Sequence, residues 1–142
     1  MASQGRGLNR TGGTNYRFPS VAGASEIISG SVSSSSDSST RATVATPNSG
    51  KKIRIVQIMA WTLSATVHRV EFYFDTGANN QSDRTKVIGS QVLDSDGTGG
   101  PNMILTFPDG AGPIGAADDV ISVRTSTNIG TSNEFEVHYR EE

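Results

Sequence analysis

The chain has 142 residues, no cysteine and a net charge of −2 at pH 7. A single domain of this length buries about 70% of the surface that its unfolded form exposes, and the lack of cysteine excludes disulfides, thiolate nucleophiles and cysteine-based zinc sites. No run approaches the roughly 18 apolar residues of a membrane span, and the N-terminus has no apolar signal core, so we expect neither a membrane partner nor secretion.

Residues 1–25 are predicted to be an extended basic arm. They contain Arg6, Arg10 and Arg17 and no acidic residue, whereas the rest of the chain has nine Lys/Arg and fourteen Asp/Glu. Glycines and Pro19 argue against the amphipathic helix of a transit peptide. The arm is either a flexible tail or a segment that becomes ordered on a neighbouring subunit. In the second case, the residues that we expect to contact the partner are Arg6, Leu8, Arg10, Tyr16, Arg17 and Phe18.

Residues 26–142 are predicted to form one β-sandwich domain. Its first part, residues 27–34 and 40–46, has two β-compatible runs separated by serines around Asp37. Short polar side chains favour a turn, which predicts a hairpin, although a serine-rich linker remains an alternative.

Residues 51–74 contain the most hydrophobic part of the chain. From residue 53 onward one apolar row occupies the odd positions, interrupted only by Gln57: Ile53, Ile55, Met59, Trp61 and Leu63. This spacing predicts a strand with all five on one face. Because Val56, Ile58 and Ala60 make the other face apolar too, we expect a central strand covered on both sides.

A second strand follows the break at residues 64–66. Its inward residues are predicted to be Val70, Phe72 and Phe74, and its outward residues Arg69, Glu71 and Tyr73. Half-buried alternation of this kind favours an outer position in a sheet.

The remaining strands are expected at residues 87–93, 103–107, 120–124 and 134–140, the last two as a hairpin-like pair. In the last strand Phe135, Val137 and Tyr139 are predicted to face inward, and Glu134, Glu136, His138 and Arg140 outward. Seven or eight strands separated by glycine- and proline-rich turns predict an all-β fold, an antiparallel β-sandwich with jelly-roll-like topology.

The sharpest chemical motif is Asp75-Thr76-Gly77, which resembles the active-site element of retroviral-type aspartic proteases. In those enzymes two such aspartates share one proton and act as acid and base. Here Val87-Ile88-Gly89 follows too soon for a flap to intervene, so we interpret the motif as a turn and keep the protease as a remote alternative.

Other candidate sites are weaker. Asp94-Ser95-Asp96-Gly97 lacks the remaining ligands of a calcium loop. His68 and His138 are expected at outward strand positions without metal-ligand spacing. The body is acidic and its basic residues are not interleaved with aromatic ones, which argues against a nucleic-acid partner. We therefore expect no enzymatic activity, no catalytic residue, no metal and no cofactor.

Residues 50–139 carry a broader pattern. Its parts are Gly50-Lys51-Lys52-Ile53-Arg54-Ile55, Val70-Glu71-Phe72, Ile114-Gly115-Ala116, Val120-Ile121-Ser122-Val123 and Val137-His138-Tyr139. This pattern resembles small all-β proteins encoded among the structural genes of tailed bacteriophages.

The resemblance implies a virion component assembled in the host cytoplasm. Its first implication is a capsid decoration (cement) protein whose arm binds neighbouring shell subunits, either the major capsid protein or another virion protein. Such a protein would also self-associate, for example as a trimer. The alternative is a fibre or tail β-sandwich module that attaches to a host surface or a carbohydrate.

Overall fold

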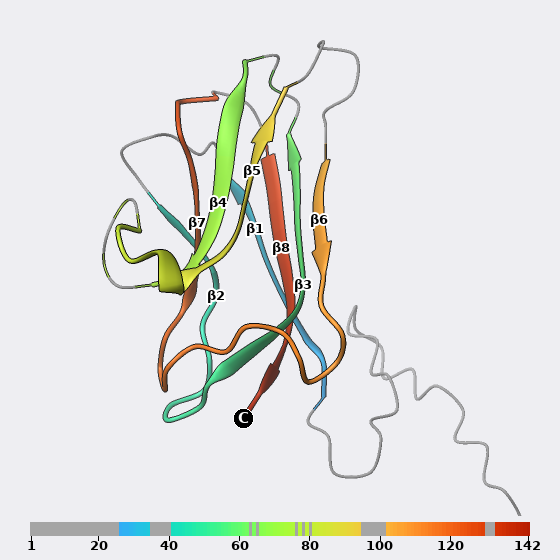
Figure 1. Ribbon diagram of the computed structural model, residues 1–142, viewed down its shortest axis with the longest axis vertical. Helices are drawn as coiled ribbons and strands as arrows, with labels where there is room; N and C mark the ends of the chain where they lie inside the picture. Colours follow the sequence, from blue (N-terminus) through green and yellow to red (C-terminus); the bar gives the residue numbers. More distant parts are fainter. Residues whose placement is uncertain are drawn as a thin grey trace, which may run out of the picture.

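The computed structural model describes residues 26–34, 41–62, 64, 66–75, 77, 79, 81–94, 102–129 and 133–142 (Figure 1). In these ranges the elements are β1 (Ile28–Ser34), β2 (Ala42–Ala45), β3 (Ile53–Thr62), β4 (His68–Phe74), the 3-10 turn η1 (Arg84–Lys86), β5 (Val87–Leu93), β6 (Asn102–Thr106), β7 (Ile121–Thr125) and β8 (Asn133–Glu141). Every strand coincides with a predicted run. Within the same ranges no helix is long and apolar enough to cross a membrane.

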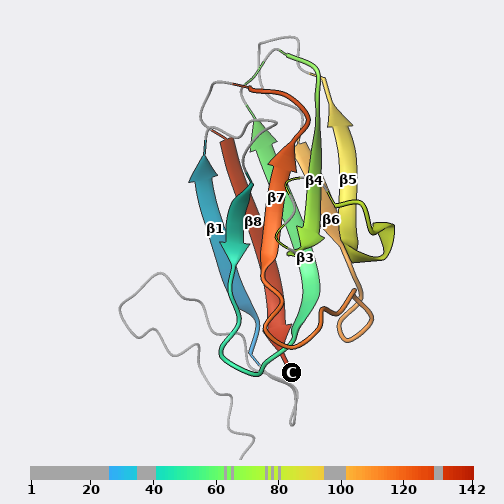
Figure 2. The same ribbon diagram turned by 90° about the vertical axis from the view of Figure 1, so that its left-hand side faces the viewer.

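The strands form two antiparallel four-stranded sheets that pack face to face (Figure 2). The first sheet has the order β1-β8-β3-β6 and the second the order β2-β7-β4-β5. Consecutive strands alternate between the sheets except for β4 and β5, which pair directly. Eight strands connected in this way form a jelly roll, so the predicted fold class is confirmed.

Two predicted strand pairings are wrong. β1 pairs with β8 and β2 with β7, so the expected hairpin between the first two strands does not form. β7 and β8 also lie in different sheets. In each case the connection is long enough to cross from one sheet to the other, and nothing in the local sequence forces a tight turn.

β4 occupies the middle of its sheet, between β7 and β5, and not the predicted outer position. Its outward side chains Glu71 and Tyr73 are only 4% and 0% exposed. Residues that follow β4 cover these two side chains. Tyr73 Oη donates a hydrogen bond to the Asn79 carbonyl oxygen at 3.4 Å, and Arg84 Nη1 lies 2.6 Å from Glu71 Oε2. A neighbouring loop can thus bury side chains that the alternation of apolar and polar residues along the strand predicts to be exposed.

The core lies between the two sheets. Phe72 of β4 and Phe135 of β8 meet edge to face across it, with ring centroids 6.1 Å apart and an interplanar angle of 77°. Around them pack the branched side chains of both inner faces, among them Ile53, Ile55, Ile58, Val70, Ile121, Val123 and Val137. Edge-to-face pairs add about 0.5–1.5 kcal/mol to the stabilisation from burial.

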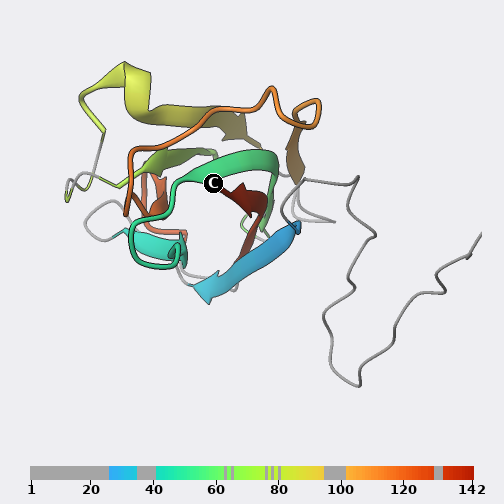
Figure 3. The same cartoon turned by 90° about the horizontal axis from the view of Figure 1, so that it is seen from below.

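The connection between β6 and β7 crosses the lower end of the sandwich (Figures 1 and 3). It is held to β3 by backbone hydrogen bonds from Ile55 N to Pro113 O at 2.9 Å and from Gly115 N to Ile53 O at 3.0 Å. A bridge between Arg54 and Ile114 adds to this contact. The connection therefore closes this end of the core.

A β-bulge at Val56 reverses the facing of β3. Against β8, Ile55 pairs with Tyr139 and Gln57 pairs with His138, so Val56 is an extra residue. Ile53 and Ile55 face the core before the bulge, and Ile58, Ala60 and Thr62 do so after it. The prediction that Met59 and Trp61 share a face with Ile53 is therefore wrong, because one extra residue moves all following side chains to the opposite face.

This facing predicts a modest effect for Trp61→Ala. We expect the free energy of unfolding to fall by about 1–2 kcal/mol, since the ring is partly buried on the sheet surface and not in the core. Urea unfolding of both proteins measures the difference. A loss of about 3–5 kcal/mol, which is typical of a core tryptophan, would contradict the bulge.

Candidate functional site

The outer face of the β1-β8-β3-β6 sheet carries the side chains that the bulge turns outward. The strand register puts Trp61 beside Glu134 and Met59 beside Glu136 on β8. On the other side of β3, Met59 lies beside Ile104, which is 53% exposed. An aromatic ring, two carboxylates and exposed apolar groups thus share one accessible surface.

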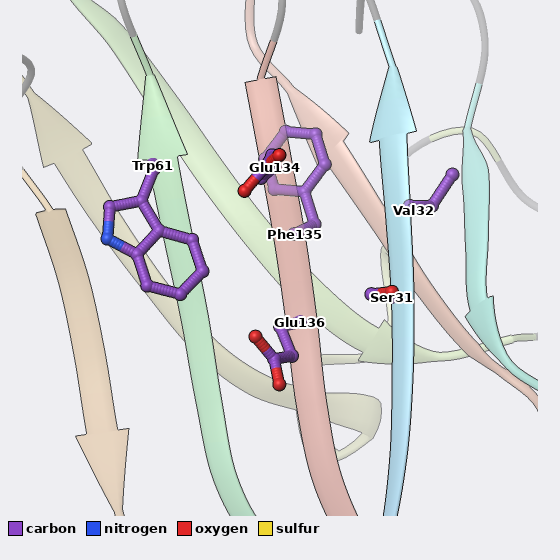
Figure 4. A pocket seen from close by; sticks show the side chains of 6 residues that line it. All are labelled: Ser31, Val32, Trp61, Glu134, Phe135 and Glu136. Carbon is purple, nitrogen blue, oxygen red and sulfur yellow. The ribbon is translucent and has the colours of Figure 1, made fainter. Parts of the chain in front are cut away.

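A hollow of about 140 Å³ opens on this face, and we call it the Trp61 hollow. Its lining residues are Ser31, Val32, Trp61, Glu134, Phe135 and Glu136. Figure 4 shows Trp61 on β3 and Ser31 on β1 flanking β8, with the Glu136 carboxylate pointing to the side where the indole lies. The small side chain of Ser31 leaves space between the edge strand and the ring.

The Trp61 hollow is acidic. Glu136 Oε1 lies 2.7 Å from His138 Nε2, while Glu134 is exposed and forms no ion pair with the part of the chain that the structure describes. A cation held over an indole face is attracted by the ring, and a carboxylate beside it adds a charge-assisted hydrogen bond. The arrangement is therefore suited to a cationic group.

Farther along the same face, two neighbouring arginines are each paired with a carboxylate. Arg54 and Arg140 are register partners, and each is held by its own carboxylate. Arg140 donates from Nε and Nη2 to both oxygens of Asp109 at 2.8 Å, and Arg54 forms a two-point pair with Glu142. These hydrogen bonds lower the pKa of Asp109 and of Glu142 below their ordinary values.

The lowered pKa values predict acid-sensitive stability. A carboxyl whose pKa is lower in the folded chain contributes stability above its unfolded pKa and loses it as the pH falls through the folded value. The ordinary values are 3.8 for Asp109 and 4.5 for Glu142. We therefore expect urea unfolding to show falling stability below about pH 4.5, and Asp109→Asn to flatten this dependence. An unchanged pH dependence in the variant would contradict the assignment.

The outer face of the second sheet is buried and polar around Glu71. Glu71 and Arg124 are cross-strand partners, only 4% and 6% exposed, and Arg84 also contacts Glu71. Burial raises the pKa of the Tyr73 hydroxyl on the same face, with Arg41 and Arg124 acting against it. Within the residues that the structure describes, Nε and Nη1 of Arg124 have no hydrogen-bond partner.

Asp75, the candidate protease aspartate, makes the contacts of a turn. Its Oδ1 accepts a hydrogen bond from Gly77 N at 2.6 Å, and its Oδ2 pairs with Arg41 just before β2. Gly77 has φ +81°, a left-handed conformation that favours glycine. Both carboxylate oxygens thus hold the chain that leaves β4, as the turn interpretation expects, while Thr76 lies outside the described residues.

The two histidines differ in position. His68 was expected to face outward, but it is 2% exposed, with Nδ1 2.7 Å from the Thr66 carbonyl oxygen. It lies an even number of residues from Val70 and so shares the inward face. His138 faces outward as predicted. The described ranges contain no group of three or more potential metal ligands, and of the calcium-like segment they include only Asp94.

The six predicted arm contacts, Arg6, Leu8, Arg10, Tyr16, Arg17 and Phe18, lie outside the described residues and stay predictions. Sequence reasoning missed the Trp61 hollow because it assigned Trp61 to the core. The outward facing of Glu134 and Glu136 was predicted correctly. The signal that could have indicated the Trp61 hollow was the pair of acidic residues at alternate positions of β8, Glu134 and Glu136.

Comparisons with known proteins add little. No protein-family model matches the chain, and no curated protein matches it. Among solved structures, it is similar to a chain of the virus-like particle of the extra small virus (XSV) of the giant freshwater prawn Macrobrachium rosenbergii, solved by cryo-EM. The two chains are 11% identical over 89% of this chain and 87% of that one, with a TM-score of 0.39. Values this low carry no argument about function.

Proposed function

We propose that this protein is a structural component of a virion, and more specifically a capsid decoration (cement) protein. The strand order β1-β8-β3-β6 and β2-β7-β4-β5 is the observation that supports this proposal most. Viral capsid proteins use jelly rolls of this kind, as do lectin domains and cupins. Because a fold alone does not decide a function, the use of the polar side chains matters as well.

The ionised side chains of the body mainly stabilise the structure. Besides the pairs of Arg54, Arg84 and Arg140 already described, Lys86 Nζ lies 2.9 Å from Asp119 Oδ2. Glu141 accepts two hydrogen bonds from Asn48. Carboxylates held in this way brace loops against strands, as a rigid scaffold requires. These contacts support a structural role, and we propose no enzymatic activity.

The arm supplies the binding element of this proposal. Residues 1–25 could reach up to about 80 Å when extended, which is enough to cross a subunit boundary. Their three arginines suit an acidic neighbour, and an extended segment can also add to the edge of a sheet. The partner would be the major capsid protein or another virion protein, and the body would associate with its own kind.

Co-sedimentation with purified shells tests this proposal. We expect the full-length protein to pellet with the shells and a variant that lacks residues 2–24 to stay in the supernatant. Thermal unfolding of both proteins provides the control that the body remains folded. Equal binding of the two proteins would reject the arm as the binding element, and failure of the full-length protein to bind would reject the decoration function.

A host-attachment or carbohydrate-binding module remains the second candidate. The observation in its favour is Trp61, an aromatic ring beside two carboxylates on an open sheet face. A volume of about 140 Å³, with Trp61 as the outward-facing aromatic residue of its lining, provides room for one ring, whereas ligand sites are usually larger. Binding to a glycan array that Trp61→Ala abolishes would favour this candidate.

A further inference from the structure

We propose that the Trp61 hollow receives an arginine side chain from the N-terminal arm of a second copy of this chain. The inference rests on the proposed function, in which the arm binds a neighbouring subunit, and it identifies the surface that the arm reaches on like subunits. It concerns contacts between copies of this protein, and not contacts with the underlying shell.

The chemistry of the Trp61 hollow fits a guanidinium group. Trp61 offers the face of an indole, the best aromatic partner for a cation. Glu134 and Glu136 lie on the adjacent strand, and in the described ranges the only ion pair of these two carboxylates is that of Glu136 with His138. A planar guanidinium can stack on the ring and also donate two parallel hydrogen bonds to a carboxylate, which a lysine cannot do.

The size of the Trp61 hollow also fits one planar group. A cavity of about 150 Å³ accommodates benzene, so about 140 Å³ accommodates a guanidinium with the end of its stem. On the side of the edge strand β1 the hollow is lined by the small side chain of Ser31. A chain running along β1 could therefore insert a side chain from that side. An oligosaccharide would extend beyond this space onto exposed apolar side chains such as Ile104.

The remaining arginines of the chain identify the source. In the described ranges Arg41, Arg54, Arg84 and Arg140 are held in ion pairs. Arg124 is buried, and only Arg69 is exposed without an ion pair. The arm contributes Arg6, Arg10 and Arg17 and no acidic residue, whereas the rest of the chain has an excess of acidic residues. Charge complementarity therefore favours the arm.

A second copy is the better donor for geometric reasons. The arm precedes β1, and the Trp61 hollow adjoins the middle of that strand at Ser31. An arm docking on its own body would have to reverse direction and run back along β1. An extended arm can instead reach a neighbour without a turn. The two arrangements give different results when variants are mixed.

Charge reversal in the full-length protein tests the inference. One variant carries Glu134→Arg and Glu136→Arg, a second carries Arg6→Glu, Arg10→Glu and Arg17→Glu, and a third combines all five changes. Sedimentation velocity measures self-association, and fluorescence of Trp61, the only tryptophan, reports on the site. We expect wild type to self-associate, and each of the first two variants to do so at least about tenfold more weakly.

Mixing supplies the decisive result. We expect an equimolar mixture of the first two variants to recover self-association together with the change in Trp61 emission, because it brings an arm arginine back to an unchanged site. The combined variant alone should recover self-association, because its charges are complementary again. Arg69→Glu is the matched control and should behave like wild type. The milder Glu134→Gln/Glu136→Gln variant should weaken association too, and it covers the case in which a reversal impairs folding.

Three outcomes would overturn the inference. The first is that the first and second variants both self-associate as strongly as wild type. The second is that self-association recovers in the combined variant but not in the mixture. The third is that Trp61 emission responds to glycans but not to protein concentration. Shell co-sedimentation of the same variants keeps the two proposals apart. Shell binding that persists while charge reversal has no effect on self-association rejects this inference and leaves the decoration function intact.

Discussion

Replacing Phe135 with alanine should lower the free energy of unfolding by about 3–5 kcal/mol. The side chain is 1% exposed and meets Phe72 of the opposite sheet edge to face, so the substitution removes packing from both sheets at once. Domains of this size are stable by about 5–15 kcal/mol in total, so the variant would lose a large share of its stability. Chemical denaturation at neutral pH measures the loss.

Phe135→Leu is the matched control for this prediction. It keeps most of the apolar volume and should cost less than about 1.5 kcal/mol if the neighbours repack. A Phe135→Ala loss below about 1 kcal/mol would mean that the two sheets do not pack across this pair.

Gly112→Ala should be the most damaging change in the connection between β6 and β7. A Cβ at this position would lie 1.8 Å from the carbonyl oxygen of Ile55, a backbone atom that cannot move aside without disturbing β3. The hydrogen bond between Ile55 N and Pro113 O would be strained at the same time. Overpacking together with a weakened hydrogen bond predicts a loss of about 2–4 kcal/mol.

Gly110→Ala in the same connection is the control that separates a steric clash from backbone strain. Gly110 has φ +78°, and no atom lies within 4 Å of the position that a Cβ would occupy, so alanine there costs only the left-handed strain of about 1 kcal/mol. Thermal unfolding of the two variants compares them directly. Equal losses would contradict the close contact between Gly112 and β3.

The sequence located the eight strands of the described ranges because hydrophobic alternation and turn residues depend on local geometry. It did not determine which strands pair. β1 and β2 lie in different sheets, as do β7 and β8, and turn composition alone does not distinguish a connection between sheets from a hairpin. The inward row of β8, with Phe135, Val137 and Tyr139, was predicted correctly because its other row is polar.

β3 could not be predicted in the same way because both of its rows are apolar. Either Met59 and Trp61 or Ile58 and Ala60 could serve as the inward row after Val56. Hydrophobicity does not choose between them, and the choice depends on a bulge in the register with β8. The Trp61 hollow was missed for this single reason, since the acidic residues beside Trp61 were placed correctly.

The central claim is that the protein is part of a virion, and quantitative mass spectrometry of gradient-purified virions tests it most directly. The account predicts that peptides from the body and the arm co-purify with the major capsid protein through successive gradients, in a fixed ratio to it. Absence of the peptides from intact particles, or a ratio that falls with each purification step, would contradict the account.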